Sequence, residues 1–149
     1  MVSLPLKIFA YSELGDGHYW VNDPGLKINV PLRIVGDEND PSHVVIELSG
    51  TVVFNEVRGW MEGLTLRRPR IAAGERQSCE SLRVTCGAKL DMTSCVLDND
   101  GCLGNVALLK GSSKGCWKDV EIRGSGQQGC GVAIYDNSHL ELIHVSFNV

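Results

Sequence analysis

Residues 82–97, LRVTCGAKLDMTSCVL, decide the fold, because their apolar pattern returns 25 residues later in ALLKGSSKGCWKDVEI (107–122) and again in VAIYDNSHLELIHVSF (132–147). Repetition at a fixed period in this range is typical of a solenoid, in which each repeat buries its apolar face only against its neighbours. Four apolar rows run through the three stretches: Val84–Leu109–Ile134, Met92–Trp117–Leu142, Cys95–Val120–Val145 and Leu97–Ile122–Phe147. Shifted back by 31 residues, the same frame predicts Val53, Met61, Leu64 and Leu66 as the preceding members.

Short alternating segments separated by glycine and polar turns fill each repeat. Residues 82–84 and 90–92 alternate apolar and polar side chains, which is typical of strands, and no window of ten or more residues has helical periodicity without a glycine. We therefore predict an all-β fold, a single-stranded right-handed parallel β-helix of about five coils with a 25-residue repeat. A leucine-rich repeat is the alternative. It requires a helical segment where this chain has a further apolar strand at residues 106–109.

The whole chain, residues 1–149, is expected to form one domain, with less regular first coils over 1–50 and regular coils over 51–149. The six extra residues in the first repeat spacing predict an excursion within 67–79. A strand ends the sequence at Val149 without a polar cap, so we expect the chain to be part of a longer protein.

Several individual positions carry their own predictions. Gly59 and Gly115 interrupt a fifth row that holds Leu90 and Leu140, which indicates a local bend or tight turn. The cluster Arg67-Arg68-Pro69-Arg70 is expected to be a solvated loop. His18 is predicted in a turn, and His144 at an exposed position in a row with Ser94 and Asp119.

Composition limits the function classes. The chain has 18 acidic and 14 basic residues and a formal net charge of −4, which gives no reason to expect nucleic-acid binding. The sequence contains no stretch long enough to cross a membrane and no basic segment followed by a long apolar one, so no membrane partner or secretion signal is predicted.

Six cysteines are present, and none forms a CxxC pair: Cys79, Cys86, Cys95, Cys102, Cys116 and Cys130. Without a secretion signal, we expect reduced thiols and a cytoplasmic or nuclear protein. Cys95 lies in an apolar row, where it would act as a small buried apolar side chain. The cysteine spacings and four scattered histidines do not fit a zinc site, so no metal and no cofactor are predicted.

The segment GLKINVPLRIVG (25–36), followed by Val44-Val45-Ile46, resembles the first coil of right-handed parallel β-helix proteins of the pectate-lyase-like superfamily. Within that superfamily the chain looks closest to intracellular eukaryotic members, such as F-box proteins with β-helix repeats, whose solenoids imply protein recognition. Other members cleave or epimerise acidic polysaccharides. The motifs of the hydrolases (Asn-Thr-Asp, Asp-Asp, Gly-His-Gly, Arg-Ile-Lys) and the Asp-Pro-His-Asp run of the epimerases are absent from this sequence.

An acidic site is one candidate. Asp98 and Asp100, together with Asp136, have the carboxylates that an acid–base pair or a Ca²⁺ ion needs. Asp-Asn-Asp-Gly is also an ordinary turn sequence. In the repeat frame, Asp98 aligns with Arg67 and Arg123 in a row of alternating charge, which explains it without chemistry.

A basic row is the stronger candidate, and we name it by its members Arg58, Lys89, Lys114 and His139, which share one position in the repeat. Like charges stacked on neighbouring strands are unfavourable, so such a row can be retained for an anionic partner. Trp60 lies beside it, as aromatic side chains do on recognition faces. The alternative is that these are turn positions whose long side chains extend into water.

Three functions follow from these patterns. The first is a non-catalytic binding or scaffold module, without catalytic residues, that recognises an acidic or phosphorylated protein. The second is a lyase or hydrolase acting on acidic polysaccharide, for which Ca²⁺ would be the cofactor. The third is a purely structural stack. The missing catalytic motifs and the many thiols favour the first.

Overall fold

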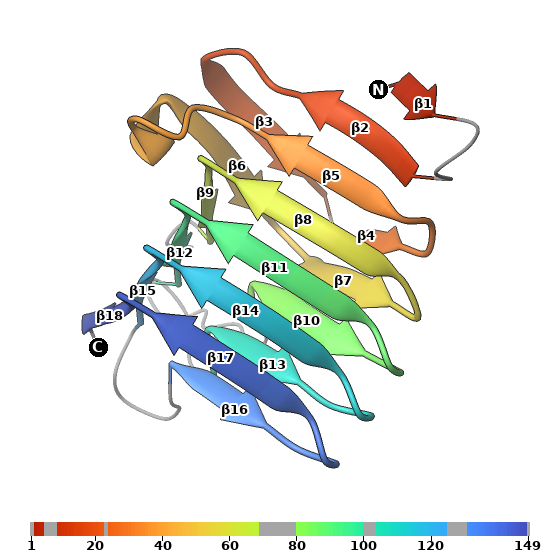
Figure 1. Cartoon of the computed structure of the whole chain (residues 1–149). Coiled ribbons are helices and arrows are strands. Elements are labelled where there is room, and N and C mark those ends of the chain that lie inside the picture. Colours follow the sequence, from red (N-terminus) through yellow and green to blue (C-terminus); the bar gives the residue numbers. More distant parts are fainter. Residues whose placement is uncertain are drawn as a thin grey trace.

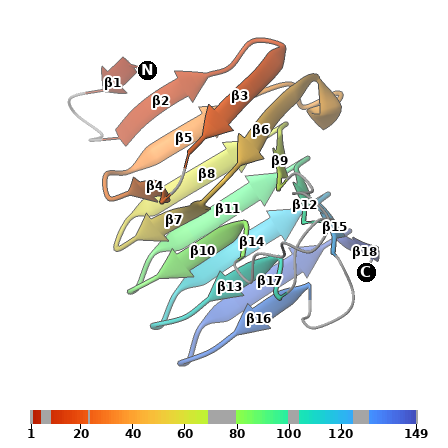
Figure 2. The same ribbon diagram turned by 180° about the vertical axis from the view of Figure 1, so that it is seen from behind.

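The computed structural model describes residues 2–4, 9–22, 24–68, 80–99, 104–124 and 131–148. As predicted, they form a parallel β-solenoid of about five coils, and its three faces are three parallel sheets. Each coil contributes one strand to sheets A, B and C in turn, and Figures 1 and 2 show the coils stacked in chain order with β1 and β18 at opposite ends.

The strands are short, and each pairs with its equivalents in the neighbouring coils. Sheet A contains β1 (Val2–Leu4), β2 (Phe9–Glu13), β5 (Leu32–Val35), β8 (Arg58–Glu62), β11 (Lys89–Thr93), β14 (Lys114–Lys118) and β17 (His139–Ile143). Sheet B contains β3 (Gly17–Val21), β6 (Val44–Leu48), β9 (Thr65–Arg67), β12 (Val96–Asp98), β15 (Glu121–Arg123) and β18 (Ser146–Asn148). Sheet C contains β4 (Gly25–Ile28), β7 (Thr51–Asn55), β10 (Leu82–Thr85), β13 (Ala107–Leu109) and β16 (Val132–Ile134). Among the described strands, only β1 pairs antiparallel, with β2.

The apolar rows form the core. Leu109, Trp117 and Ile122 are fully buried, and each pairs with the residue that the 25-residue frame predicts. Their equivalents in the last coil, Leu142 and Phe147, remain 41% and 44% exposed because no described strand covers them. Cys95 is buried, as predicted, and burial raises the pKa of its thiol to about 12.

One member of the predicted frame is wrong by a residue. Val84 pairs with Phe54, which is buried, whereas Val53 pairs with Arg83 on the outer face of sheet C. The cause is a corner of different length, because Glu56 and Val57 join β7 to β8 while residues 86–88 join β10 to β11.

The corners between sheets A and B use left-handed backbone conformations. Gly63, Ser94, Asp119 and His144 occupy equivalent places with φ of 67°, 53°, 54° and 51°. Short polar residues and glycine adopt this conformation most readily, which explains the polar row predicted at Ser94 and Asp119. His144 is exposed, as predicted.

Gly59 and Gly115 do not bend the chain, which corrects the sequence prediction. Both lie inside strands of sheet A, where they leave room for large neighbours. A Cβ on Gly59 would stand 2.4 Å from the ring of Phe54, and one on Gly115 would stand 2.6 Å from the Leu90 carbonyl oxygen and 3.1 Å from the Trp117 indole nitrogen. The glycines therefore accommodate aromatic packing rather than a turn.

The first coils follow the same architecture. The clean alternation over residues 26–34 divides into β4 and β5, and the predicted buried strand at Val44–Ile46 is β6. His18 lies in strand β3 and not in a turn, which is a second correction. The described residues include a single helical element, the 3₁₀ turn Pro41–His43, and none of their helices is long and apolar enough to cross a membrane.

Candidate functional site

The basic row lies on the outer face of sheet A, because its members begin four consecutive strands. Arg58 pairs with Lys89, Lys89 with Lys114, and Lys114 with His139. The next residue in each strand faces the core, which fixes the row on the outside. The alignment predicted from the repeat is therefore confirmed, and Figure 1 shows the four strands side by side.

Arg58 differs from the rest of the row because its charge is already neutralised. Its guanidinium forms an ion pair with Asp91 on the neighbouring strand and donates a hydrogen bond of 3.0 Å to the Gly59 carbonyl oxygen. It also lies over the ring of Trp60, 4.2 Å from the centroid. These contacts hold Arg58 flat against the sheet, and its guanidinium covers one face of the Trp60 ring.

Lys89, Lys114 and His139 extend into solvent. All three side chains are exposed, and none forms a hydrogen bond or ion pair with any other residue in the described parts of the chain. They therefore place three potentially cationic groups on adjacent strands, which is the part of the basic row that remains available to an anion.

A second outward row runs parallel to the basic row and is mixed in charge. It consists of Tyr11, Arg33, Trp60, Asp91, Cys116 and Glu141. The Arg33 guanidinium donates to both carboxylate oxygens of Glu62 at 3.0 and 2.8 Å, and this bond raises the pKa of Arg33. Burial, followed by the nearby carboxylates of Glu141 and Asp91, raises the pKa of the Cys116 thiol. This thiol is consequently not activated as a nucleophile.

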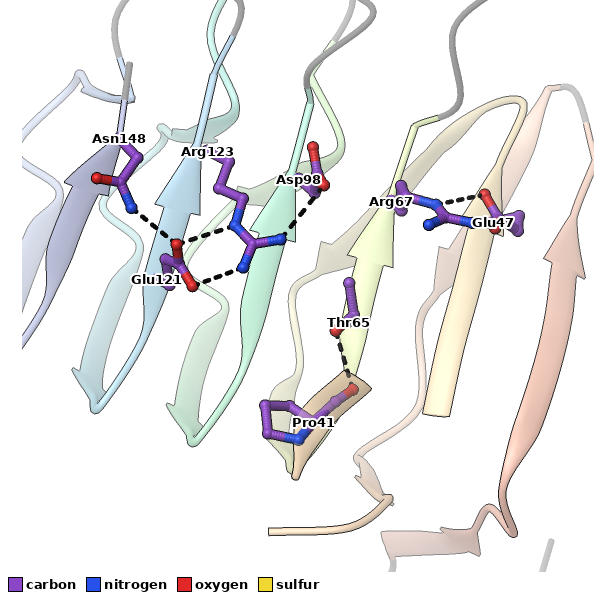
Figure 3. A network of polar contacts seen from close by, with 8 residues as sticks. All are labelled: Pro41, Glu47, Thr65, Arg67, Asp98, Glu121, Arg123 and Asn148. Atoms are coloured by element: carbon purple, nitrogen blue, oxygen red, sulfur yellow. Dashed lines mark hydrogen bonds and ion pairs between the residues drawn. The ribbon is translucent and has the colours of Figure 1, made fainter. Parts of the chain in front are cut away.

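The charged row predicted around Asp98 is confirmed on the outer face of sheet B, and Figure 3 shows it close by. It begins one coil earlier than predicted, because Glu47 pairs with Arg67 in register and forms an ion pair with it. The Glu47 side chain is only 3% exposed, and His18 Nδ1 lies 3.3 Å from one of its oxygens.

Farther along this row, Arg123 contacts two carboxylates. Its Nη1 lies 3.7 Å from Asp98, and its Nε donates to Glu121 at 2.9 Å, which lowers the pKa of Glu121. Asn148 donates to the same carboxylate at 2.7 Å. Asp98 is therefore part of an ion-pair network, as the repeat frame predicts.

The alternative acidic site is not assembled by its described members. Asp98 ends β12 in sheet B, whereas Asp136 follows β16 at the corner after sheet C, with φ of 55°. Asp100 lies outside the described residues, as do Cys79, Cys102, Cys130 and the excursion at 69–79.

Two polar features were missed by sequence reasoning. Arg68 is buried, not solvated, and its Nη2 donates to the carbonyl oxygens of Gly50 at 3.0 Å and Glu80 at 3.1 Å. Asp16, Asp37 and His43 place one ligand atom each within 4.8 Å of one another at an exposed corner.

His43 is at the centre of this corner. Its Nδ1 lies 3.0 Å from Asp37 and its Nε2 3.2 Å from Asp40, and the contact with Asp37 raises the pKa of the imidazole. The contact with His43 lowers the pKa of Asp37. At Asp40, hydrogen bonds from the Ser42 hydroxyl and backbone N–H lower the pKa most, and the charge of His43 adds to them. A protonated His43 between carboxylates is a sufficient reason for the cluster.

The three described cysteines, Cys86, Cys95 and Cys116, are free thiols. Comparisons with protein-family models, with curated proteins and with solved structures found no significant match to this chain. The assignment of a function therefore depends on the surface chemistry of the solenoid itself.

Proposed function

We propose that the chain is a non-catalytic β-solenoid binding module that recognises an acidic or phosphorylated protein through the outer face of sheet A. The observation that carries the proposal is the set of three exposed side chains, Lys89, Lys114 and His139, on adjacent strands without an internal partner among the described residues. Neighbouring parallel strands lie about 4.8 Å apart, so the ammonium groups of Lys89 and Lys114 repel one another unless an anion lies between them.

The contrast with the other charged row supports this choice. On sheet B, Arg67 and Arg123 each form an ion pair with a carboxylate of the protein itself. On sheet A, Arg58 is the one member of the basic row that has such a partner among the residues that the structure describes. A row that is neutralised at one end and open along the rest is typical of an interaction surface rather than of a structural ion-pair network.

The resemblance to pectate-lyase-like β-helices, and within them to intracellular eukaryotic F-box proteins with β-helix repeats, agrees with protein recognition on a solenoid face. A cytoplasmic or nuclear location belongs to the same proposal and is supported by the free thiols at Cys86, Cys95 and Cys116.

A binding screen monitored by thermal unfolding tests the proposal. The probes are a glutamate-rich peptide, a phosphopeptide and an oligogalacturonate, the last with and without Ca²⁺. We expect the peptides to raise the unfolding temperature of the wild type and of the control variant Lys27→Ala/Lys110→Ala, which removes two exposed cations from sheet C and its corner. The peptides should leave the unfolding temperature of Lys89→Ala/Lys114→Ala unchanged. A shift with the oligogalacturonate alone would favour the carbohydrate-active alternative, and no shift with any probe would contradict the proposal.

A second, ligand-free measurement asks whether the row is strained. Removing stacked like charges should raise the free energy of unfolding of Lys89→Ala/Lys114→Ala by about 0.2–1 kcal/mol relative to wild type. A clear loss of stability would show that these lysines support the fold and would count against a functional row.

A further inference from the structure

We infer that the partner presents an acidic α-helix, which lies along the solenoid axis across strands β11, β14 and β17. The inference rests on the proposed function and adds the form of the partner. It follows from the direction of the basic row, which runs across the strands, and from the spacing of its charges.

The spacing of the row matches one face of a helix. Lys89, Lys114 and His139 are in register on adjacent strands, so their backbones are separated by steps of about 4.8 Å. Residues three or four apart on a helix lie about 5–6 Å from one another on one face, and the helix rises about 5.4 Å per turn. Acidic residues at i, i+4 and i+7 would therefore meet the three side chains in turn. The flexible lysine side chains can accommodate the small difference between the spacing of the helix and that of the row.

An extended segment fits less well. Same-face residues of a strand are about 6.6–6.8 Å apart, so three of them span about 13 Å, whereas the two steps of the row span only about 9.6 Å. A strand laid along β14 instead, parallel to the sheet strands, would meet only one member of the row, because the members lie on different strands.

A sugar chain, which would stack on an aromatic ring, also fits this surface less well. The aromatic side chain next to Arg58 on β8 is Trp60, and the Arg58 guanidinium lies over its ring, 4.2 Å from the centroid. A sugar ring that stacked on that face would have to displace Arg58 from both Trp60 and Asp91. An acidic helix needs no such displacement, because the exposed lysines reach out from the sheet.

The second outward row limits how wide the acidic face of the partner helix can be. Asp91 is neutralised by Arg58, but Glu141 is exposed beside His139 and next to Cys116 in the same row. An acidic residue placed over Glu141 would be repelled. The partner helix should therefore carry its acidic residues in a single narrow stripe.

Fluorescence anisotropy at low ionic strength with three labelled peptides of equal length and net charge tests the inference. The first forms a helix with glutamates at i, i+4, i+7 and i+11. The second has the same composition with the glutamates dispersed around the helix, and the third has the striped sequence with a central proline that breaks the helix. We expect the striped helix to bind about 2- to 25-fold more tightly than either control, since it adds two exposed ion pairs, each contributing a factor of about 1.4 to 5.

Variants connect the binding to the row. Lys114→Ala should weaken binding of the striped peptide about two- to fivefold and Lys89→Ala/Lys114→Ala further, whereas Lys27→Ala/Lys110→Ala should leave it unchanged. If all three peptides bind equally and depend on the lysines, the proposed function stands and the helical partner is wrong. If none binds, or only an oligogalacturonate added as a fourth probe does, both are wrong.

Discussion

Substitution of Trp117 tests how much the packing between neighbouring coils stabilises the solenoid. Its side chain is fully buried, it pairs in register with Met92 and Leu142, and its indole Nε1 donates to the Leu90 carbonyl oxygen at 3.2 Å. Replacing a buried tryptophan by alanine costs about 3–5 kcal/mol, because burial is lost and a cavity remains. Leu142 occupies the same row one coil later but is 41% exposed, so Leu142→Ala should cost only about 1 kcal/mol.

Urea unfolding followed by far-ultraviolet circular dichroism measures both values. The variant Trp117→Phe separates the two contributions, since it keeps an aromatic ring and loses the bond to the Leu90 carbonyl, at a cost of about 1–3 kcal/mol. Because solenoid coils contact only their neighbours, the Trp117→Ala transition should also broaden as the last coils unfold before the rest. Equal costs for Trp117→Ala and Leu142→Ala would refute the stacking of these rows.

Three further outcomes are expected. Gly59→Ala should lower the free energy of unfolding by about 1–3 kcal/mol, because the new methyl group meets the Phe54 ring. Adding Phe54→Leu to this variant should recover part of the lost stability. If the costs of the two substitutions simply add in the double variant, the two residues do not contact one another. Arg67→Ala should cost about 1.5–3 kcal/mol, because it removes the charged partner of the buried Glu47 carboxylate, and an unchanged urea midpoint would contradict that ion pair. The pKa of His43 is raised in the folded state above its ordinary value of 6.5, so the stability that its protonated form contributes is fully present below that pH and is lost as the pH rises through the folded pKa. Urea unfolding between about pH 6 and 8 should show this loss of stability in wild type. An equal loss in His43→Ala would refute the assignment to His43.

The repeat could be predicted from the sequence because parallel stacking turns a fixed spacing into physical contact. Rows such as Leu97–Ile122–Phe147 appear directly in the strand register. Val53 was displaced by one residue because the frame assumes corners of constant length, and the corner before β8 is shorter than the corner before β11. A bend at Gly59 was predicted because the packing of the Phe54 ring against Gly59, around the corner between β7 and β8, leaves no trace in the local pattern.

The candidate site was predicted in part for the same reason. The register places Arg58 in the basic row, as expected, but its neutralisation by Asp91 joins two different rows, and a row-by-row alignment cannot show it. The grouping of Asp16, Asp37 and His43 was also missed, because these residues meet only where separate corners come together. Their sequence spacing matches no ligand motif.

Charge reversal on sheet A shows whether the basic row is a recognition surface. The affinity of a glutamate-rich helical peptide is measured for wild type, for Lys89→Glu/Lys114→Glu and for the matched control Lys27→Glu/Lys110→Glu, which carries the same net charge on another part of the solenoid. We expect binding to be abolished in the first variant, to fall only slightly in the second, and to weaken in wild type as salt is raised. Equal loss in the two variants would show that the peptide responds to net charge alone, and would contradict a recognition surface on sheet A.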